Sequence, residues 1–331
     1  TTGVANPYLL LEPSRTNLIS QSEYFGGWTL ISNGTGSDPV LDFGYISPGG
    51  LNNAYKITLD SGAGTATSDE SIIYLNKSGV TAGSEHTASV YLKGAVGGEE
   101  VIVRDTAGGY KKWTLTTEWA RYEYTQTATA TSYATSFGLR QGLGGIGTIN
   151  SNAVVYIYGF QSELGSYPTS YIPTYSVSAT RAQDVCNKAD ASGEIGQTEG
   201  TMFVDFTFNG NPTSVDYSIM ILGAIGSNYI TIGGYNTSLY ARVFNTTMQG
   251  TINAFSMVAG TRYKVALAYA NNDVVMYVNG VNEGSDTSAS IPAVSQIGFT
   301  RPSYGASTDI LNSQVYKERL TNAELATLTT I

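Results

Sequence analysis

The chain has few charged residues, one cysteine and one histidine. Charged residues make up 13% of its 331 positions, whereas an average soluble domain has roughly a quarter. A single cysteine, Cys186, cannot form an internal disulfide. A single histidine, His86, excludes a two-histidine metal site and leaves one residue for any Ser-His-acid triad. These shortages argue against a disulfide scaffold and predict a protein that is not an enzyme.

Basic runs and long apolar runs are also missing. Seventeen Lys and Arg residues against 26 Asp and Glu residues give a net charge of −9, and the longest basic run is the pair Lys111-Lys112. Nucleic-acid binding generally needs a basic patch that neutralises phosphates. No segment approaches the roughly 20 apolar residues that a membrane-spanning helix requires. We therefore expect no nucleic-acid partner and no membrane insertion.

The chain is rich instead in the residues of strands, tight turns and uncharged polar surfaces. It contains 38 glycines and 24 tyrosines, and 41% of its residues are hydrophobic. Tyrosine favours strands, whereas glycine favours tight turns. Single cores stop growing at about 250–300 residues, so this length predicts two domains. Such a surface is typical of an extracellular or virion protein.

Short alternating segments separated by Gly, Ser and Asn predict the domain organisation. Residues 17–164 form a first sandwich and residues 200–331 a second, as segments such as 154–158 (VVYIY) and 201–209 (TMFVDFTFN) indicate. Residues 1–16 are expected to be a connecting segment. Residues 165–199 are expected to be an extended Pro/Tyr linker, because Pro168 and Pro173 exclude both a helix and a central strand.

Local signals in the second sandwich predict two hairpin turns and one helix. Residues 271–273 (NND) and 279–280 (NG) have the composition of hairpin turns. Thr321 and Glu324 form a capping-box pattern ahead of Leu325 and Leu328, which are expected to face inward. The predicted fold class is all-β, with two tandem antiparallel β-sandwiches of the jelly-roll type and a short C-terminal helix.

Two segments that bracket the first sandwich resemble segments of phage tail-fibre and other virion-surface proteins. The first is 9–18 (LLLEPSRTNL), followed by Ser22-Glu23 and Trp28, and the second is 157–174 (IYGFQSELGSYPTSYIPT), followed by 180–182 (TRA). This resemblance implies a fibre, tail or capsid-surface component of a phage. It also implies contact with other virion proteins and a homo-oligomer, expected to be a trimer.

Other segments resemble known sandwich families. Residues 91–93 (YLK) and 115–122 (LTTEWARY) are similar to carbohydrate-binding-module jelly rolls. Residues 262–269 (RYKVALAY), 276–280 (MYVNG) and 315–325 (VYKERLTNAEL) resemble the concanavalin-A-like and laminin-G-like lectin sandwiches. These resemblances imply two sandwiches and contact with glycans, but such folds host many unrelated activities.

Aromatic residues near polar groups are the candidate glycan-binding residues. A sugar offers an apolar ring face to an aromatic plate and hydroxyl groups to polar side chains. Trp113 follows a polar turn and is a candidate in the first sandwich, while Trp119 is expected in the core. In the second sandwich the candidates are Tyr229, Tyr235, Tyr240 and Arg242, which fall on or beside consecutive predicted strands.

Catalysis and metal binding are the competing interpretations. Glycoside hydrolysis needs two carboxylates on one face, yet the acidic pairs Asp69-Glu70 and Glu99-Glu100 are adjacent and would point to opposite faces of a strand. A structural calcium ion is a further hypothesis. Its ligands would be residues 271–273, or three carboxylates brought together by the bracketing segments: Glu12, Glu23 and Glu163.

The sequence as a whole predicts a protein displayed on a virion surface, or else secreted or on a bacterial cell surface. Its expected role is adhesion to host or environmental glycans, with weak contacts multiplied by several copies. A purely structural decoration protein and a glycan depolymerase domain remain the alternatives. An acidic pair in a cleft would indicate the depolymerase, and a surface without exposed aromatic residues would indicate decoration.

Overall fold

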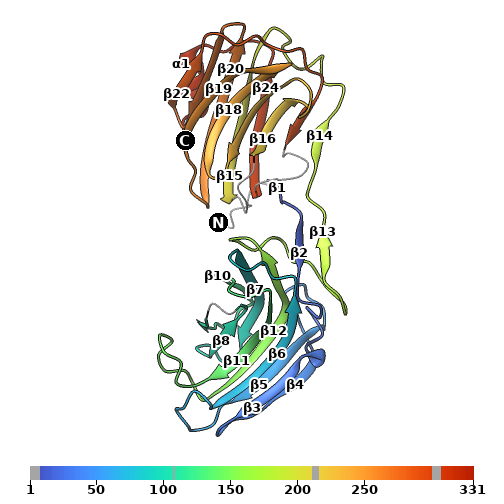
Figure 1. The fold of residues 1–331 in the computed structure, drawn as a ribbon, viewed down its shortest axis with the longest axis vertical. Coiled ribbons are helices and arrows are strands. Elements are labelled where there is room, and N and C mark those ends of the chain that lie inside the picture. Colours follow the sequence, from blue (N-terminus) through green and yellow to red (C-terminus); the bar gives the residue numbers. More distant parts are fainter. Residues whose placement is uncertain (1–7, 107–108, 211–215, 300–306) are drawn as a thin grey trace. The chain divides into compact units, whose positions relative to one another are not determined.

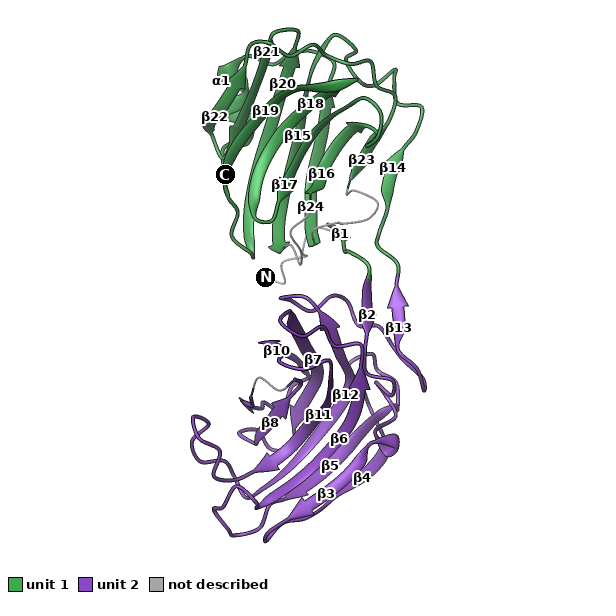
Figure 2. Ribbon diagram, viewed as in Figure 1, with its two compact units in different colours: residues 1–14, 182–331 green, residues 15–181 purple. Residues whose placement is uncertain are grey.

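The computed structural model describes residues 8–106, 109–210, 216–299 and 307–331, and the regular secondary structure of these residues is almost entirely β-strand (Figure 1). The chain divides into two compact units (Figure 2). Unit 2 comprises Arg15–Arg181, and unit 1 combines residues 1–14 with residues 182–331. Each unit is built from antiparallel sheets, so the predicted all-β class with β-sandwiches and a C-terminal helix is confirmed.

Unit 2 contains two five-stranded sheets. The first sheet has the order β10 (Ala120–Thr127), β7 (Glu85–Gly94), β12 (Asn152–Leu164), β5 (Ala54–Asp60), β4 (Ser37–Tyr45). The second sheet has the order β3 (Thr29–Asn33), β6 (Glu70–Ser78), β11 (Ser132–Arg140), β8 (Glu100–Arg104), β9 (Lys111–Thr114). A short 3-10 helix, η1 (Phe25–Gly27), precedes β3.

The core of unit 2 lies between these two sheets and explains which side chains remain on the surface. Val155 and Ile157 of β12 are fully buried in one cluster with Val101 and Val103 of β8. Successive side chains of a strand point to opposite faces. The residues between the buried ones on β12, β7 and β5 therefore occupy the outer face of the first sheet, where most of the candidate site described below is found.

The two bracketing segments of the sequence close unit 2 as a clasp. They pair directly as β2 (Arg15–Asn17) and β13 (Ala179–Arg181). The Asn17 side chain donates hydrogen bonds to the carbonyl oxygens of Phe160 and Ile172 at 3.2 and 2.9 Å. The Arg15 guanidinium lies 3.3 Å from the buried Glu163 carboxylate. Residues 15–18 of the first segment and residues 157–174 of the second are thus structural parts of this unit.

This packing corrects the predicted linker. Residues 165–181 belong to unit 2, where Thr169, Ile172 and Thr174 are buried. Ile172 is held by its backbone N–H, which donates to Gln161 Oε1 at 2.7 Å. The prolines do exclude a helix here, but the segment meets its hydrogen-bonding needs by packing on the domain surface. The segment contains no helix, as predicted, whereas its predicted separation from the sandwich was wrong.

Unit 1 contains two six-stranded sheets. One has the order β1 (Leu9–Leu11), β24 (Ser307–Tyr316), β15 (Glu199–Gly210), β20 (Thr261–Ala270), β21 (Asp273–Val278), β22 (Val281–Asp286). The other has the order β14 (Cys186–Lys188), β23 (Ile297–Phe299), β16 (Asp216–Gly223), β17 (Tyr229–Tyr235), β18 (Ser238–Asn245), β19 (Thr247–Ser256).

The first strand of unit 1 corrects the predicted boundary at its start. Residues 9–11 pair with β24, and Leu11 is buried in the same core cluster as Phe206 and Phe208. The segment expected to be a connector is therefore an edge strand of the second sandwich. Unit 2 is inserted between β1 and β14 of unit 1, so the two sandwiches are nested in the chain and do not simply follow one another.

The predicted local signals of unit 1 are confirmed. Asn272, Asn279 and Gly280 all have positive φ, at the β20–β21 and β21–β22 hairpin turns. Helix α1 (Asn322–Thr329) carries the capping box, and its Leu325 packs against the sheet. Among the described residues, the model contains no helix long and apolar enough to span a membrane.

Candidate functional site

The predicted binding residues of unit 1 share one sheet face, but their rings are largely covered. The register of β17 with β18 places Tyr229, Tyr235, Tyr240 and Arg242 on the same side. Tyr240 is only 4% exposed, because the Arg242 guanidinium lies 3.7 Å from its ring centroid. Burial also raises the pKa of Tyr240 well above its usual value.

Neighbouring side chains account for the positions of these residues without any ligand. Arg242 Nη1 lies 3.1 Å from Asp216 Oδ1, so its charge is neutralised. The Tyr229 ring stacks on Phe244 with ring centroids 5.3 Å apart. Of the four predicted residues, Tyr235 alone is exposed, at 46%. Their role in glycan binding stays a prediction.

The prediction for Trp113 needs correction. Its side chain is 7% exposed and lies in the core of unit 2, where its ring centroid is 5.5 Å from that of Tyr122. A buried indole cannot stack on a sugar. Because the polar residues 110–112 precede it, Trp113 was predicted to be exposed. The alternation of side chains along β9 instead points Trp113 inward beside Val101, its partner in register.

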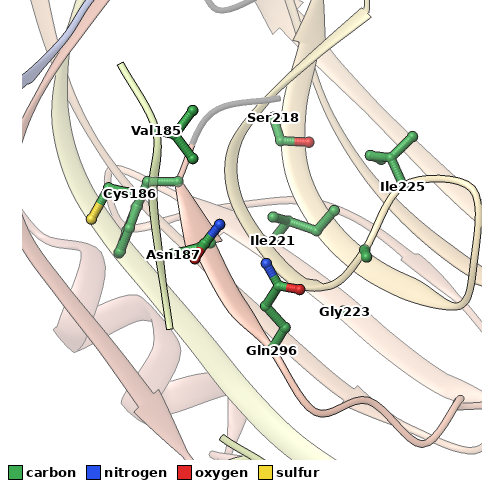
Figure 3. Close-up of a pocket in the computed structure, with 11 residues that line it drawn as sticks. Val185, Cys186, Asn187, Ser218, Ile221, Gly223, Ile225 and Gln296 are labelled. Atoms are coloured by element: carbon green, nitrogen blue, oxygen red, sulfur yellow. The ribbon is translucent and has the colours of Figure 1, made fainter. Parts of the chain in front are cut away.

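Unit 1 also contains a small pocket beside β14 and β16 (Figure 3). Its volume is about 120 Å³, and Ile221, Gly223, Asn187 and Gln296 are among its lining residues. Sites for small organic ligands usually measure about 300–1,000 Å³. This pocket is too small for a sugar ring.

The first sheet of unit 2 carries a continuous outer surface of aromatic and cationic side chains, here called the aromatic face. All of its members are half-buried, so each is anchored by packing and still reaches solvent. Cross-strand register brings them together: Tyr156 is opposite both Lys56 and Lys93, and Tyr91 is opposite both Tyr158 and Arg121. The aromatic face comprises Tyr45, Lys56, Tyr91, Lys93, Trp119, Arg121, Tyr156 and Tyr158.

One end of the aromatic face is organised around Lys93. Its Nζ lies 4.8 Å from the ring centroid of Tyr156 and 5.5 Å from that of Trp119. Tyr45 extends this group, with its ring centroid 5.2 Å from that of Tyr156. A cation held over two aromatic rings is positioned at low entropic cost and keeps its donors for a ligand. The arrangement offers apolar ring surface and hydrogen-bond donors side by side.

Trp119 was expected in the core, but it is half-buried on this face, where a hydrogen bond fixes it. Trp119 Nε1 donates to the carbonyl oxygen of Ile46 at 3.2 Å. Trp119 precedes β10 and Ile46 follows β4, which are the two opposite edge strands of the sheet. The contact therefore spans the sheet and holds the indole in one orientation. Such fixing lowers the entropic cost of stacking a ligand on the ring.

The other end of the aromatic face is a cluster of tyrosines. Tyr158 and Tyr171 have ring centroids 5.7 Å apart, and Tyr91 contacts both at 6.2 and 6.4 Å. Their hydroxyl groups converge on Glu23: Tyr158 and Tyr171 donate to Oε1 at 3.0 and 3.2 Å. Burial, reinforced by the bond to Glu23, raises the pKa of Tyr158 to about 12. Tyr158 therefore stays protonated at neutral pH.

The charges of the aromatic face are unevenly balanced. Lys56 is neutralised by Asp42 at 3.1 Å, and the hydrogen bond of Tyr45 to this carboxylate, with Lys56 beside it, lowers the pKa of Asp42. Lys93 and Arg121 have no acidic partner within the described part of the chain. Arg121 instead donates to Ser89 Oγ at 2.8 Å. The face thus carries two cations that a ligand can neutralise.

The residues considered for calcium do not assemble into one site. Glu23 accepts from tyrosines and Glu163 pairs with Arg15, both in unit 2, whereas Glu12 belongs to unit 1. In the turn 271–273, Asp273 pairs with Arg319 at 2.8 Å. Within the described residues, no group of three His, Cys, Asp or Glu side chains is placed to hold a metal ion.

The single histidine has a structural environment. His86 is fully buried, and its Nε2 accepts a hydrogen bond from the Thr81 backbone N–H at 3.1 Å. Burial lowers its pKa. A general base must reach the group that it deprotonates, and this imidazole lies inside the sandwich. The residue is therefore part of the core of unit 2.

Most of the aromatic face was missed by sequence reasoning, although a signal was present. In 154–158 (VVYIY) the tyrosines alternate with Val155 and Ile157, so they occupy the face opposite the core. Residues 91–93 (YLK) show the same alternation, with Leu92 inward. What the sequence did not reveal is which strands are neighbours, and hence that Tyr156, Lys93 and Trp119 meet.

No family model and no curated protein matches this chain. Among solved structures, it is similar to the Ruminococcus gnavus IT-sialidase CBM40, with 18% identity over 41% of this chain and 85% of that chain and a TM-score of 0.35. It is also similar to domain 4 of AbnA, a GH43 extracellular arabinanase from Geobacillus stearothermophilus in complex with arabinotriose. There the identity is 14% over 50% and 82% of the two chains, with a TM-score of 0.36.

A third similar structure is the botulinum neurotoxin type G receptor binding domain, with 10% identity, coverage of 40% and 38%, and a TM-score of 0.34. These identities and TM-scores are low. The function of this chain is therefore argued from its own residues.

Proposed function

We propose that this protein is a non-catalytic glycan-binding protein and that unit 2 binds the glycan on the aromatic face. The observation that carries the proposal is the group formed by Lys93 with the rings of Tyr156 and Trp119, 4.8 and 5.5 Å away. Aromatic rings can cover the apolar face of a sugar ring, while ammonium, guanidinium and phenol groups hydrogen-bond to its hydroxyl groups.

The dimensions of the aromatic face favour a chain of sugars over a single small molecule. Its side chains extend over all five strands of the sheet, from Tyr45 on β4 to Arg121 on β10. Neighbouring strands lie about 4.8 Å apart, so several sugar rings can lie across the sheet. Lys93 and Arg121, which have no acidic partner among the described residues, favour glycans that carry acidic groups at some positions.

We place this activity on a virion surface, in a fibre, tail or capsid component that adheres to host or environmental glycans. Support comes from the resemblance of residues 9–18 and 157–174 to segments of such proteins. A homo-oligomer, expected to be a trimer, would present several copies of the aromatic face. Several weak contacts on one particle then give high avidity without any additional contact.

A structural decoration protein is the second candidate. The observation that favours it is the clasp, because the segments that resemble virion proteins are used to close unit 2, as the Arg15–Glu163 pair at 3.3 Å illustrates. A decoration protein needs a stable sandwich and no ligand. The two candidates differ in what the aromatic face does when glycans are offered.

Glycan-array screening of the full chain, displayed in several copies, tests the proposal. We expect saturable binding to a defined glycan class, and titration with the best glycan should change the fluorescence of Trp119. Trp119→Ala should weaken binding about tenfold or more through loss of stacking. Lys111→Ala, an exposed change on the other sheet, is the matched control. Absence of binding to every glycan would support structural decoration instead.

A further inference from the structure

The second sheet of unit 2 carries a groove that the aromatic face does not explain. Its lining residues come mainly from β6, β11 and β8, with one residue just before β9, and its volume is about 280 Å³. This sheet is on the other side of the sandwich core from the aromatic face. The groove is lined by Ile31, Glu70, Ile72, Tyr74, Arg104, Tyr110, Tyr133, Ala134, Ser136 and Arg140, and is here called the arginine groove.

Arg104 is the central polar group of the arginine groove. Its guanidinium carbon lies 4.4 Å from the ring centroid of Tyr133 and 5.0 Å from that of Tyr110. Its Nη1 donates to Tyr110 Oη at 3.2 Å. No carboxylate of the described residues lies within ion-pair distance of it. The guanidinium is therefore held in place by two rings and retains its charge.

The second arginine of the groove is already neutralised. Arg140 Nη1 lies 3.3 Å from Glu70 Oε2, and Arg140 Nε donates to the Thr67 carbonyl oxygen at 2.8 Å. Arg140 Nη1 also donates to Tyr110 Oη at 2.8 Å. Two arginines and one glutamate leave the groove with one uncompensated positive charge, located at Arg104. This positive charge lies in a concave surface of a protein whose net charge is −9.

We propose that the arginine groove is a second ligand site, which binds the acidic group of a sugar through Arg104. A guanidinium presents a planar fork of donors that matches the two oxygens of a carboxylate or the oxygens of a sulfate. Tyr74 and Tyr133 supply aromatic surface beside it, and Ser136, which is opposite Arg104 in register, supplies a hydroxyl group. The ligand class is a uronic acid or a sulfated sugar.

The groove suits a terminal or single sugar unit. Its volume is close to the lower end of ordinary small-ligand sites, about 300 Å³, and is thus far smaller than the aromatic face. The site is independent of the proposed function, because its residues come from the other sheet. A glycan with acidic branches would engage both surfaces, whereas a neutral glycan would engage the aromatic face alone.

NMR titration of the full chain with methyl β-D-glucuronide, galactose 6-sulfate and the neutral methyl β-D-glucoside tests this site. We expect at least one charged sugar to shift the resonances of the groove residues at millimolar concentration and the glucoside to leave these resonances unshifted. Arg104→Gln should weaken the binding at least tenfold, while Arg104→Lys, which keeps the charge but loses the fork, should weaken it less. Binding of the glucuronide, of the sulfate or of both identifies which acidic group is recognised.

Two further variants make the result decisive. Ser136→Glu places a carboxylate opposite Arg104 and should abolish binding even though Arg104 remains. Lys188→Gln, an exposed change in unit 1, should leave it unchanged. Shifts of the groove residues that survive Arg104→Gln, equal shifts with the glucoside, or no shift with either charged sugar would overturn the site. Inorganic sulfate that binds as tightly as the sulfated sugar would mean that the sugar ring contributes nothing, which also overturns it.

Discussion

At the scale of single residues, the charged side chains occupy two contrasting environments. Lys77 and Asp105 are both fully buried and form an ion pair inside unit 2. Ser162 and Thr135 donate to the Asp105 carboxylate at 2.8 and 2.9 Å. Lys93, by contrast, is half-buried over two rings without a carboxylate. Buried charges need partners, so an unpaired cation at the surface is the more informative sign of a ligand.

The buried histidine gives a prediction about pH. Burial and the nearby charge of Lys77 lower the pKa of His86 below its ordinary value of 6.5. As pH falls below about 6.5, the unfolded chain takes up a proton that the folded chain excludes, so the free energy of unfolding decreases. The slope is at most about 1.4 kcal/mol per pH unit. Urea unfolding followed by tryptophan fluorescence, at pH 7.5 and at pH values down to 5.5, measures it.

The control for this prediction is His86→Gln, which should remove the slope. Glu163 acts with the opposite sign, because burial raises its pKa and stability then rises as pH falls. All three tryptophans, Trp28, Trp113 and Trp119, belong to unit 2, so the fluorescence signal reports on that unit. An identical pH dependence in the wild-type chain and in His86→Gln would contradict this role of His86.

At the scale of elements, strands in which apolar and polar residues alternate strongly were predicted from the sequence. Strands without this alternation were missed. Strands such as β15 (Glu199–Gly210), in which Met202, Val204, Phe206 and Phe208 are all buried, were predicted. Strand β4 was missed because Pro39 and Gly44 interrupt its pattern and most of its side chains are exposed. Edge strands bury one side poorly, so hydrophobic periodicity cannot reveal them.

Helix α1 supplies a prediction at this scale. Thr321 accepts from the backbone N–H of Glu324, while Glu324 accepts from the backbone N–H of Thr321. Thr321→Ala leaves helix donors without a partner and should lower the free energy of unfolding of unit 1 by about 1 kcal/mol. Chemical unfolding followed by far-UV circular dichroism measures the loss. The exposed Thr327→Ala within the helix is the control, and an equal loss in both variants would refute the role of the cap.

At the scale of the whole molecule, the order of the units along the chain was not predictable from local pattern. Residues 9–11 read as a short apolar segment, and their pairing with β24 joins positions about 300 residues apart, such as Leu9 and Ile310. Periodicity indicates that a segment is a strand but carries no information about its partner. The same limit concealed the aromatic face, whose residues come from separate strands.

Because unit 2 is inserted into unit 1, two residues only eight positions apart in the chain, Leu11 and Ile19, are predicted to stabilise different units. Leu11 is 1% exposed in the core of unit 1, and Ile19 is fully buried in the core of unit 2. Leu11→Ala and Ile19→Ala should each cost about 2–5 kcal/mol. Ile19→Ala should shift the transition seen by tryptophan fluorescence. Leu11→Ala should shift only the remaining transition seen by circular dichroism. Both variants shifting the fluorescence transition equally would contradict the nested order.

The central claim is that glycan binding belongs to the aromatic face of unit 2. The most direct measurement compares the affinity of the full chain and two variants for the best glycan found by array. Tyr156→Ala removes the ring beside Lys93, whereas Tyr235→Ala removes the exposed tyrosine of unit 1. The account predicts at least about tenfold weaker binding for Tyr156→Ala and unchanged binding for Tyr235→Ala. Loss of binding in Tyr235→Ala with full affinity in Tyr156→Ala would contradict it.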